Sequence, residues 1–197
     1  PLSTSKVIWQ LVAIFLVAAA GLYPLTAAPA KIRDRMASHA PHTLNGMTYM
    51  AYSSYNDQGV EMYLDQDYEA IHWMLQHVDG SPVIVEGNTP EYRWGSRFTV
   101  YTGLPGVVGW NWHQRQQRGF VSNEWVTNRV AEIATFYQTT NTEEAVQFLK
   151  RYQVKYIILG QLERIYYPGV GLEKFDLMNG VLWKEVFREQ DTVIYEV

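Results

Sequence analysis

The 197-residue sequence contains no cysteine, which excludes disulfide bonds, thiolate metal sites and a cysteine nucleophile. It also carries little charge, because only 18% of its residues are charged, and the formal net charge is -4 with a pI near 5.7. A chain without excess positive charge exerts no general electrostatic attraction on nucleic acid. Nucleic acid is therefore not an expected partner, and any recognition of anions must be local.

The short motifs of several enzyme classes are also missing. The sequence has no Walker loop, no GxSxG elbow, no HExxH pair and no dinucleotide glycine fingerprint. His72 and His77 are five residues apart in a predicted helix, so they lie on different faces and do not form a metal pair. The sequence therefore gives no support for a hydrolase, nucleotidase or dehydrogenase. It identifies no catalytic residue and predicts no cofactor or metal.

Near the N-terminus there is a long apolar run, VIWQLVAIFLVAAAGLYPL, over residues 7–25. Nineteen residues at about 1.5 Å per residue nearly span a hydrocarbon core of about 30 Å. We interpret residues 1–30 as a transmembrane helix with its flanks. A signal peptide and a buried soluble helix are the alternatives, although signal cores are typically only about 7 to 15 residues long.

The charged residues that flank the apolar run do not settle its orientation in the membrane. Lys31, Arg33 and Arg35 follow the apolar run, whereas only Lys6 precedes it. The positive-inside rule alone would place the following domain in the cytoplasm, but large domains translocate largely regardless of such charges. The first residue is Pro1, which suggests a processed chain or a piece of a longer one.

Residues 31–60 are predicted to be a linker and lead-in, and residues 61–197 a soluble α/β domain. In the latter, apolar residues recur at helical spacing over residues 65–78, followed by a strand at residues 83–85. Short strands are expected at residues 98–101 and 107–110.

The second half of the domain continues the alternation. A helix capped by Ser122 or Asn123 and another over residues 142–152 precede an apolar strand at residues 155–160. A short helix at residues 173–178 and a hairpin formed by residues 181–188 and 192–197 complete the pattern. This order predicts a three-layer α/β domain with a mixed sheet and a C-terminal hairpin, preceded by one transmembrane helix.

A candidate site follows the first predicted strand. This stretch gathers arginine, tryptophan and tyrosine, although the chain as a whole is acidic. Guanidinium groups give forked, permanently charged donors for phosphate or carboxylate, and flat aromatic rings stack on sugars or on guanidinium. We predict that seven residues bind a substrate on one face at the strand C-terminal ends: Glu86, Arg93, Arg97, Trp112, His113, Arg115 and Arg118.

Each of these residues has a simpler alternative role. The arginines could pair with acids at a surface or interface, and His113 could be structural beside tryptophan. Glu86 at a strand exit could orient Arg93 or Arg97. Glu163 and Arg164 follow the second strand, where they could form an internal salt bridge that closes the same cleft or contact a ligand.

Several separated segments carry a family resemblance: TLNGMTYM, AIHWMLQHVDGSPVIVEG, TGLPGVVGWNWHQRQQRG and YQVKYIILGQLERIYYPGVGLEKF. In this order they resemble the C-terminal part of the large YYY-type membrane proteins of bacteria and archaea, over about residues 43–197. Those multi-spanning proteins are grouped with the C-type integral-membrane glycosyltransferases, which use polyprenyl-phosphate-linked sugars. One departure is His113-Gln114, where the family pattern often has His-Glu.

The resemblance implies a last membrane span followed by an extracytoplasmic α/β domain. Such glycosyltransferases keep their catalytic acid in an early loop between spans, so this chain alone is not expected to be catalytic. The expected function is to assist binding of a polyprenyl-phosphate-linked sugar or its acceptor. The expected partners are the lipid bilayer, a lipid-linked sugar, and an upstream transmembrane region or other membrane subunits. The alternative is a single-span accessory subunit that docks onto a larger membrane complex.

Overall fold

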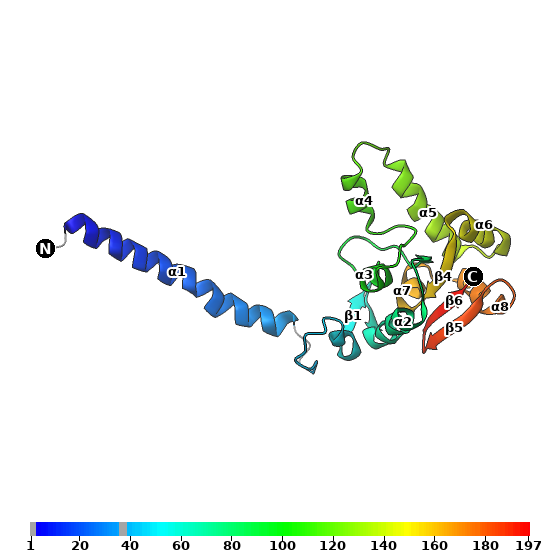
Figure 1. Cartoon of the computed structure of the whole chain (residues 1–197), viewed down its shortest axis with the longest axis horizontal. Helices are drawn as coiled ribbons and strands as arrows, with labels where there is room; N and C mark the ends of the chain where they lie inside the picture. Colours follow the sequence, from blue (N-terminus) through cyan, green and yellow to red (C-terminus); the bar gives the residue numbers. More distant parts are fainter. Residues whose placement is uncertain (1–2, 36–38) are drawn as a thin grey trace. The chain divides into compact units, whose positions relative to one another are not determined.

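The computed structural model describes residues 3–35 and 39–197 and divides into two compact units (Figure 1). The first unit is Pro1–His42 and the second is Thr43–Val197. The first consists mainly of helix α1 (Thr4–Arg35), and the second contains the sheet and all other helices of the described residues.

Helix α1 has the length and composition of a membrane span. It has 32 residues, a mean hydropathy of 2.1 in its most apolar window and no buried residue. It is the only helix in residues 3–35 and 39–197 long and apolar enough to cross a membrane. At about 1.5 Å per residue it exceeds the roughly 30 Å of a hydrocarbon core. The predicted apolar helix is therefore present, and a membrane anchor and a signal sequence both fit its properties.

A mixed four-stranded sheet forms the centre of the second unit. Its strand order is β3 (Val83–Val85), β4 (Val154–Leu159), β6 (Thr192–Glu196) and β5 (Lys184–Glu189). Strands β3 and β4 are parallel, whereas β6 is antiparallel to both β4 and β5. The predicted mixed sheet and its C-terminal hairpin are confirmed.

The sheet separates two hydrophobic cores. Alternate residues of β4 point to opposite faces, so Ile157 and Leu159 enter one core and Tyr156 and Ile158 the other. The first core is covered by α5 (Glu124–Gln138), α6 (Thr142–Tyr152) and α8 (Glu173–Leu177). The second is covered by α2 (Leu64–His77) and α3 (Arg97–Thr102). The three-layer α/β prediction is confirmed, because helices lie on both faces of the sheet.

The segment before α2 carries structure of its own. It contains a short 3-10 helix, Thr48–Tyr52, and an antiparallel hairpin of β1 (Ser54–Asp57) and β2 (Val60–Tyr63). Gln58 and Gly59 form the turn with φ values of 52° and 79°, the left-handed pair that a two-residue hairpin turn requires. Part of the predicted lead-in is therefore a folded hairpin.

The prediction of a strand at residues 98–101 is wrong, because these residues lie in α3. The carboxylate of Glu86 accepts hydrogen bonds from the backbone N–H groups of Phe98 (3.0 Å) and Thr99 (2.9 Å). A side chain distant in sequence thus caps this short helix. Residues 107–110 are not a strand either. Gly106 makes only an isolated bridge with Ile84.

Helices α5 and α6 begin at residues whose side chains cap them locally. The side chain of Asn141 accepts hydrogen bonds from the N–H groups of Glu143 (2.9 Å) and Glu144 (3.4 Å) at the start of α6. At the start of α5, Ser122 rather than Asn123 provides the side-chain cap, since its hydroxyl accepts from the N–H of Glu124 at 3.3 Å. Remaining short elements are α4 (Asn111–Gln117), α7 (Gln161–Tyr166) and a 3-10 turn, Val170–Leu172.

Candidate functional site

The exits of the two parallel strands lie at the same edge of the sheet. Glu86 directly follows β3, and Glu163 lies in the first turn of α7, which directly follows β4. In open α/β sheets this edge is where ligands usually bind.

Both carboxylates face one buried guanidinium. The side chain of Arg97 is only 1% exposed, and its Nη1 and Nη2 atoms donate to the two oxygens of Glu163 at 3.1 and 3.0 Å. Its Nε donates to Oδ2 of Asp67 in α2 at 2.6 Å, and Glu86 lies 3.8 Å from Nη1. We call these four residues the Arg97 cluster. Burial acts against the charge of Arg97, but the surrounding carboxylates hold its pKa well above the ordinary value.

Glu163 joins the two strand exits. Besides Arg97, it accepts hydrogen bonds from the N–H groups of Gly87 after β3 (2.7 Å) and Gly160 after β4 (2.8 Å). Burial acts to raise the pKa of Glu163, but Arg97 and these donors together lower it. A Cβ atom on Gly87 would lie 2.9 Å from Glu163, and one on Gly160 would lie 3.0 Å from Arg97. The glycines are required for this close approach.

Glu86 has a different electrostatic environment. It accepts from two backbone N–H groups of α3 and from the hydroxyl of Thr99 at 2.7 Å. Its burial outweighs the effect of Arg97 and these hydrogen bonds and raises its pKa. Glu86 and Arg97 are thus buried parts of the scaffold, so neither is available to a ligand in this conformation. Of the two roles left open for Glu163 and Arg164, the internal salt bridge between them is not formed, because Glu163 pairs with Arg97.

Arg93 lies apart from the Arg97 cluster. Its side chain is 51% exposed, and its Nη1 atom is 3.7 Å from the carboxylate of Asp57 in β1. This contact connects the loop after β3 to the β1–β2 hairpin. Of the interpretations open for this arginine, the structure favours pairing with an acid.

The two remaining predicted arginines lie on α4 or just after it, together with exposed aromatic rings. The guanidinium of Arg115 lies 5.3 Å from the ring centroid of Trp112, and that of Arg118 lies 4.6 Å from that of Trp125. Trp112 is 52% exposed and Phe120 is fully exposed. Figure 1 shows α4 and the turn into α5 at the periphery of this unit, away from the sheet. We call these five residues the α4 surface.

The α4 surface is held to the loop after β3. The carboxylate of Glu91 in that loop accepts a hydrogen bond from the N–H of Trp112 at 2.6 Å. The side chain of Asn111 accepts from Nη2 of Arg115 at 3.0 Å, and Gln114 accepts from Arg118. These contacts, together with stacking on tryptophan, limit the orientations available to the guanidinium groups.

His113 points toward a second aromatic group. Its ring centroid lies 5.7 Å from that of Tyr92 and 5.5 Å from that of Trp110. Its Nδ1 atom is buried and has no hydrogen-bond partner among the described residues. This packing favours the structural interpretation of His113.

The structure therefore divides the predicted site. Glu86 and Arg97 are buried together, Arg93 contacts the hairpin, and Trp112, His113, Arg115 and Arg118 lie on α4 or directly after it. The seven residues do not share one exposed face. Asp67, an acid in the first turn of α2 that is buried beside Arg97, is not among the residues predicted from the sequence. No local pattern distinguishes Asp67 from an ordinary helix-start carboxylate.

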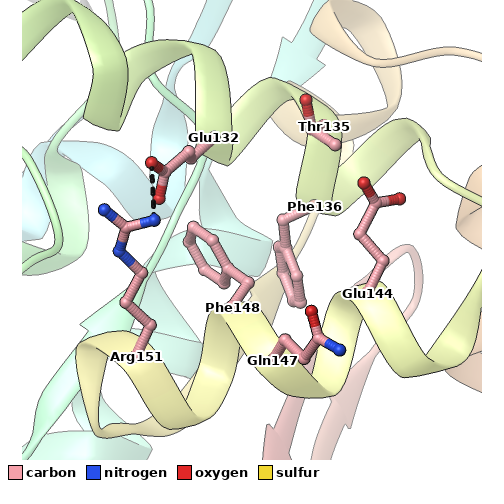
Figure 2. A pocket seen from close by; sticks show the side chains of 7 residues that line it. All are labelled: Glu132, Thr135, Phe136, Glu144, Gln147, Phe148 and Arg151. Carbon is pink, nitrogen blue, oxygen red and sulfur yellow. Dashed lines mark ion pairs between the residues drawn. The ribbon is translucent and has the colours of Figure 1, made fainter.

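A separate groove lies between α5 and α6 (Figure 2). The rings of Phe136 and Phe148 stack with centroids 4.6 Å apart, and Arg151 pairs with Glu132 at 3.1 Å. None of the seven predicted residues lines this groove. Among the described residues, no group of three or more His, Asp or Glu side chains could hold a metal ion.

Comparisons with known proteins give similarities to solved structures alone. No family profile and no curated protein matches the sequence. The structure is similar to the C-terminal globular domain of an oligosaccharyltransferase from Archaeoglobus fulgidus, with a TM-score of 0.43 and 13% identity. The similarity covers 66% of this chain and 94% of that domain. At this level it describes a related arrangement of elements and carries no conclusion about activity.

Proposed function

We propose that this chain is the last span and soluble domain of a membrane glycosyltransferase-like protein. In this proposal the domain is extracytoplasmic and assists binding of a polyprenyl-phosphate-linked sugar or its acceptor. The sequence resemblance to YYY-type membrane proteins supports the assignment, and helix α1 supplies a segment able to anchor the domain at a bilayer. The chemistry itself would belong to the rest of the parent protein.

The α4 surface is the observation that carries the proposed binding role. Neither Arg115 nor Arg118 has a carboxylate within ion-pair distance in the described part of the chain, although acids outnumber bases overall. Their guanidinium groups are stacked on tryptophan and remain able to donate to a phosphate. The neighbouring exposed rings, Trp112 and Phe120, provide apolar area for a sugar face or a lipid chain.

The test measures the affinity of the full chain, reconstituted in phosphatidylcholine nanodiscs, for a polyprenyl phosphate added to the same nanodiscs. Replacing Arg115 or Arg118 by alanine removes a charge-assisted contact worth about 1.5 to 3 kcal/mol. Each replacement should therefore weaken binding of the polyprenyl phosphate at least about tenfold. Arg151→Ala is the matched control, because Arg151 is exposed and pairs with Glu132 in the separate groove. Unchanged affinity in both α4 variants, with normal melting, would remove the α4 surface from the proposal.

A second candidate function is an accessory subunit that docks onto a larger membrane complex. The full exposure of Phe120 and the 55% exposure of the adjacent Val121 favour it. The variant Phe120→Ser separates the two candidates when polyprenyl-phosphate binding and co-purification from the native host are both measured. Loss of co-purifying membrane subunits from the native host, with polyprenyl-phosphate binding intact, would support the accessory subunit.

A further inference from the structure

The second strand exit opens into a pocket unconnected with the α4 surface. A cavity of about 630 Å³ lies where β4 ends, between the β1–β2 hairpin, α7 and the turn from β5 to β6. Ligands of open α/β sheets commonly bind beyond the carboxyl ends of parallel strands. The cavity volume is within the usual range for small-molecule sites.

The pocket walls are fixed by two glutamine side chains. Gln161 at the start of α7 accepts from the backbone N–H of Tyr63 at 3.0 Å and donates to its carbonyl at 2.9 Å. Gln66 in α2, which is only 2% exposed, accepts from the N–H of Asp191 at 3.1 Å and donates to Gln190 at 3.3 Å. The hairpin and the β5–β6 turn are thereby held on opposite sides of the pocket before any ligand arrives.

Several polar groups in the lining remain available. Arg164 uses Nε to donate to the carbonyl of Asp191 at 3.4 Å, but its Nη atoms have no partner in the described residues. The carboxylate of Asp191 and the amide nitrogen of Gln190 also have no partner within the described residues. A guanidinium, a carboxylate and an amide thus line one pocket without satisfying one another.

The lining of the pocket also contains exposed apolar and aromatic side chains. Tyr63 is 57% exposed and Val60 is 48% exposed, and both line the cavity with Pro168. An aromatic ring beside planar polar side chains suits a ligand that has flat apolar faces and hydroxyl edges. Each hydroxyl both donates and accepts, which matches a lining that contains donors (Arg164), acceptors (Asp191) and amides.

We propose that this pocket binds a hydroxyl-rich saccharide. The inference goes beyond the proposed function, because it requires neither the α4 surface nor a phosphate. Arg164 and Asp191 would contact ring hydroxyls, and Tyr63 would pack against a sugar face. The prepositioned Gln66 and Gln161 would reduce the ordering cost of binding.

The experiment uses the full chain in phosphatidylcholine nanodiscs prepared without glycoside detergents, which would compete for the pocket. Maltotriose, mannotriose and chitotriose are tested separately by saturation-transfer NMR titration. At least one should bind, and Arg164→Ala and Asp191→Ala should each weaken it about tenfold, as expected for loss of a charged hydrogen bond. Arg151→Ala and Glu173→Ala are the matched controls, since both side chains are exposed and lie outside the pocket.

Asp191→Ala is the more decisive variant, because its exposed carboxylate makes no hydrogen bond or ion pair with another described residue, so the fold should be retained. Absence of binding for all three trisaccharides, or equal binding by Asp191→Ala and the unmodified chain, would overturn the inference. The double variant Arg115→Ala with Arg118→Ala should retain trisaccharide binding. If it does so while losing polyprenyl-phosphate binding, the two sites are independent. If it loses trisaccharide binding, the saccharide lies on the α4 surface and the pocket proposal fails.

Discussion

Arg97 and Arg115 come from the same aromatic-rich stretch, yet they occupy opposite environments. Arg97 is buried among three carboxylates, whereas Arg115 lies on an indole ring with no carboxylate within ion-pair distance in the described chain. The partners of Arg97 come from α2, the β3 exit and α7, far apart in sequence. One arginine-rich segment thus supplies both a buried structural cluster and an exposed surface. Whether an arginine is buried or exposed here depends on whether carboxylates from distant parts of the sequence approach it in the fold.

The largest expected effect comes from removing the buried arginine. Arg97→Ala should lower the free energy of unfolding by about 3 to 5 kcal/mol, because it leaves buried carboxylates without their counter-charge. Urea denaturation of the full chain, followed by tyrosine and tryptophan fluorescence, measures this loss. Arg115→Ala in the same assay should change stability by no more than about 0.5 kcal/mol. Equal losses in the two variants would break the comparison.

The two acids at the strand exits should also differ. Each carboxylate oxygen of Glu163 accepts one hydrogen bond from Arg97 and one from a glycine N–H. In Glu163→Gln the amide NH₂ group would therefore face two donors in either orientation of the amide. We expect a loss of about 2 to 4 kcal/mol. Glu86→Gln should cost only about 1 to 2 kcal/mol, because its amide would oppose one N–H and burial already raises the pKa of Glu86. Denaturation at pH 7 provides the ranking, and the reverse order would contradict it.

A second buried cation, Lys174, shows the effect of burial without an ion-pair partner in the described part of the chain. Lys174 is buried and donates to the carbonyls of Tyr137 (2.9 Å) and Gly171 (2.8 Å), but among the described residues no carboxylate lies within ion-pair distance. Burial lowers its pKa from 10.5 to about 7, although Glu144 acts in the opposite direction. Between these values the unfolded chain binds more protons than the folded chain, so stability should rise with pH.

Measuring the free energy of unfolding from pH 7 to 9 tests this pH dependence. The unmodified chain should gain stability over that range, and Lys174→Met should flatten the profile. Lys150→Met is the control, because Lys150 is exposed on α6 and should leave the slope unchanged. A slope that survives in Lys174→Met would assign the titration to another group.

Much of the fold could be predicted from periodicity. Strand β4 is an apolar run buried on both faces, and the stripes of α2, α5 and α6 match their amphipathic patterns. Helix α3 could not be predicted in this way, because Glu86 caps it from outside the segment. The β1–β2 hairpin had one usable signal, the turn ending in Gln58-Gly59, but each of its strands has only four residues.

Less of the site could be predicted, for an electrostatic reason. Residue types correctly marked the stretch after β3 as unusual, but sequence spacing does not report which acids approach which arginine in space. Asp67 and Glu163 lie 30 and 66 residues from Arg97. The sequence therefore could not show that Glu86 and Arg97 are buried together, or that Glu163 pairs with Arg97 and not with Arg164. The ligand-binding role of the α4 residues stays a prediction.

The bonding of Glu163 also has a dynamic consequence. One carboxylate accepts from the amides of Gly87 and Gly160, so neither strand exit can detach without disturbing the anchor of the other. Local opening at this edge of the sheet is then a joint event, and the two amides belong to one cooperative unit of hydrogen exchange. A disturbance that loosens the loop leading to α4 would be transmitted through Glu163 to α7, which forms one wall of the pocket beyond β4.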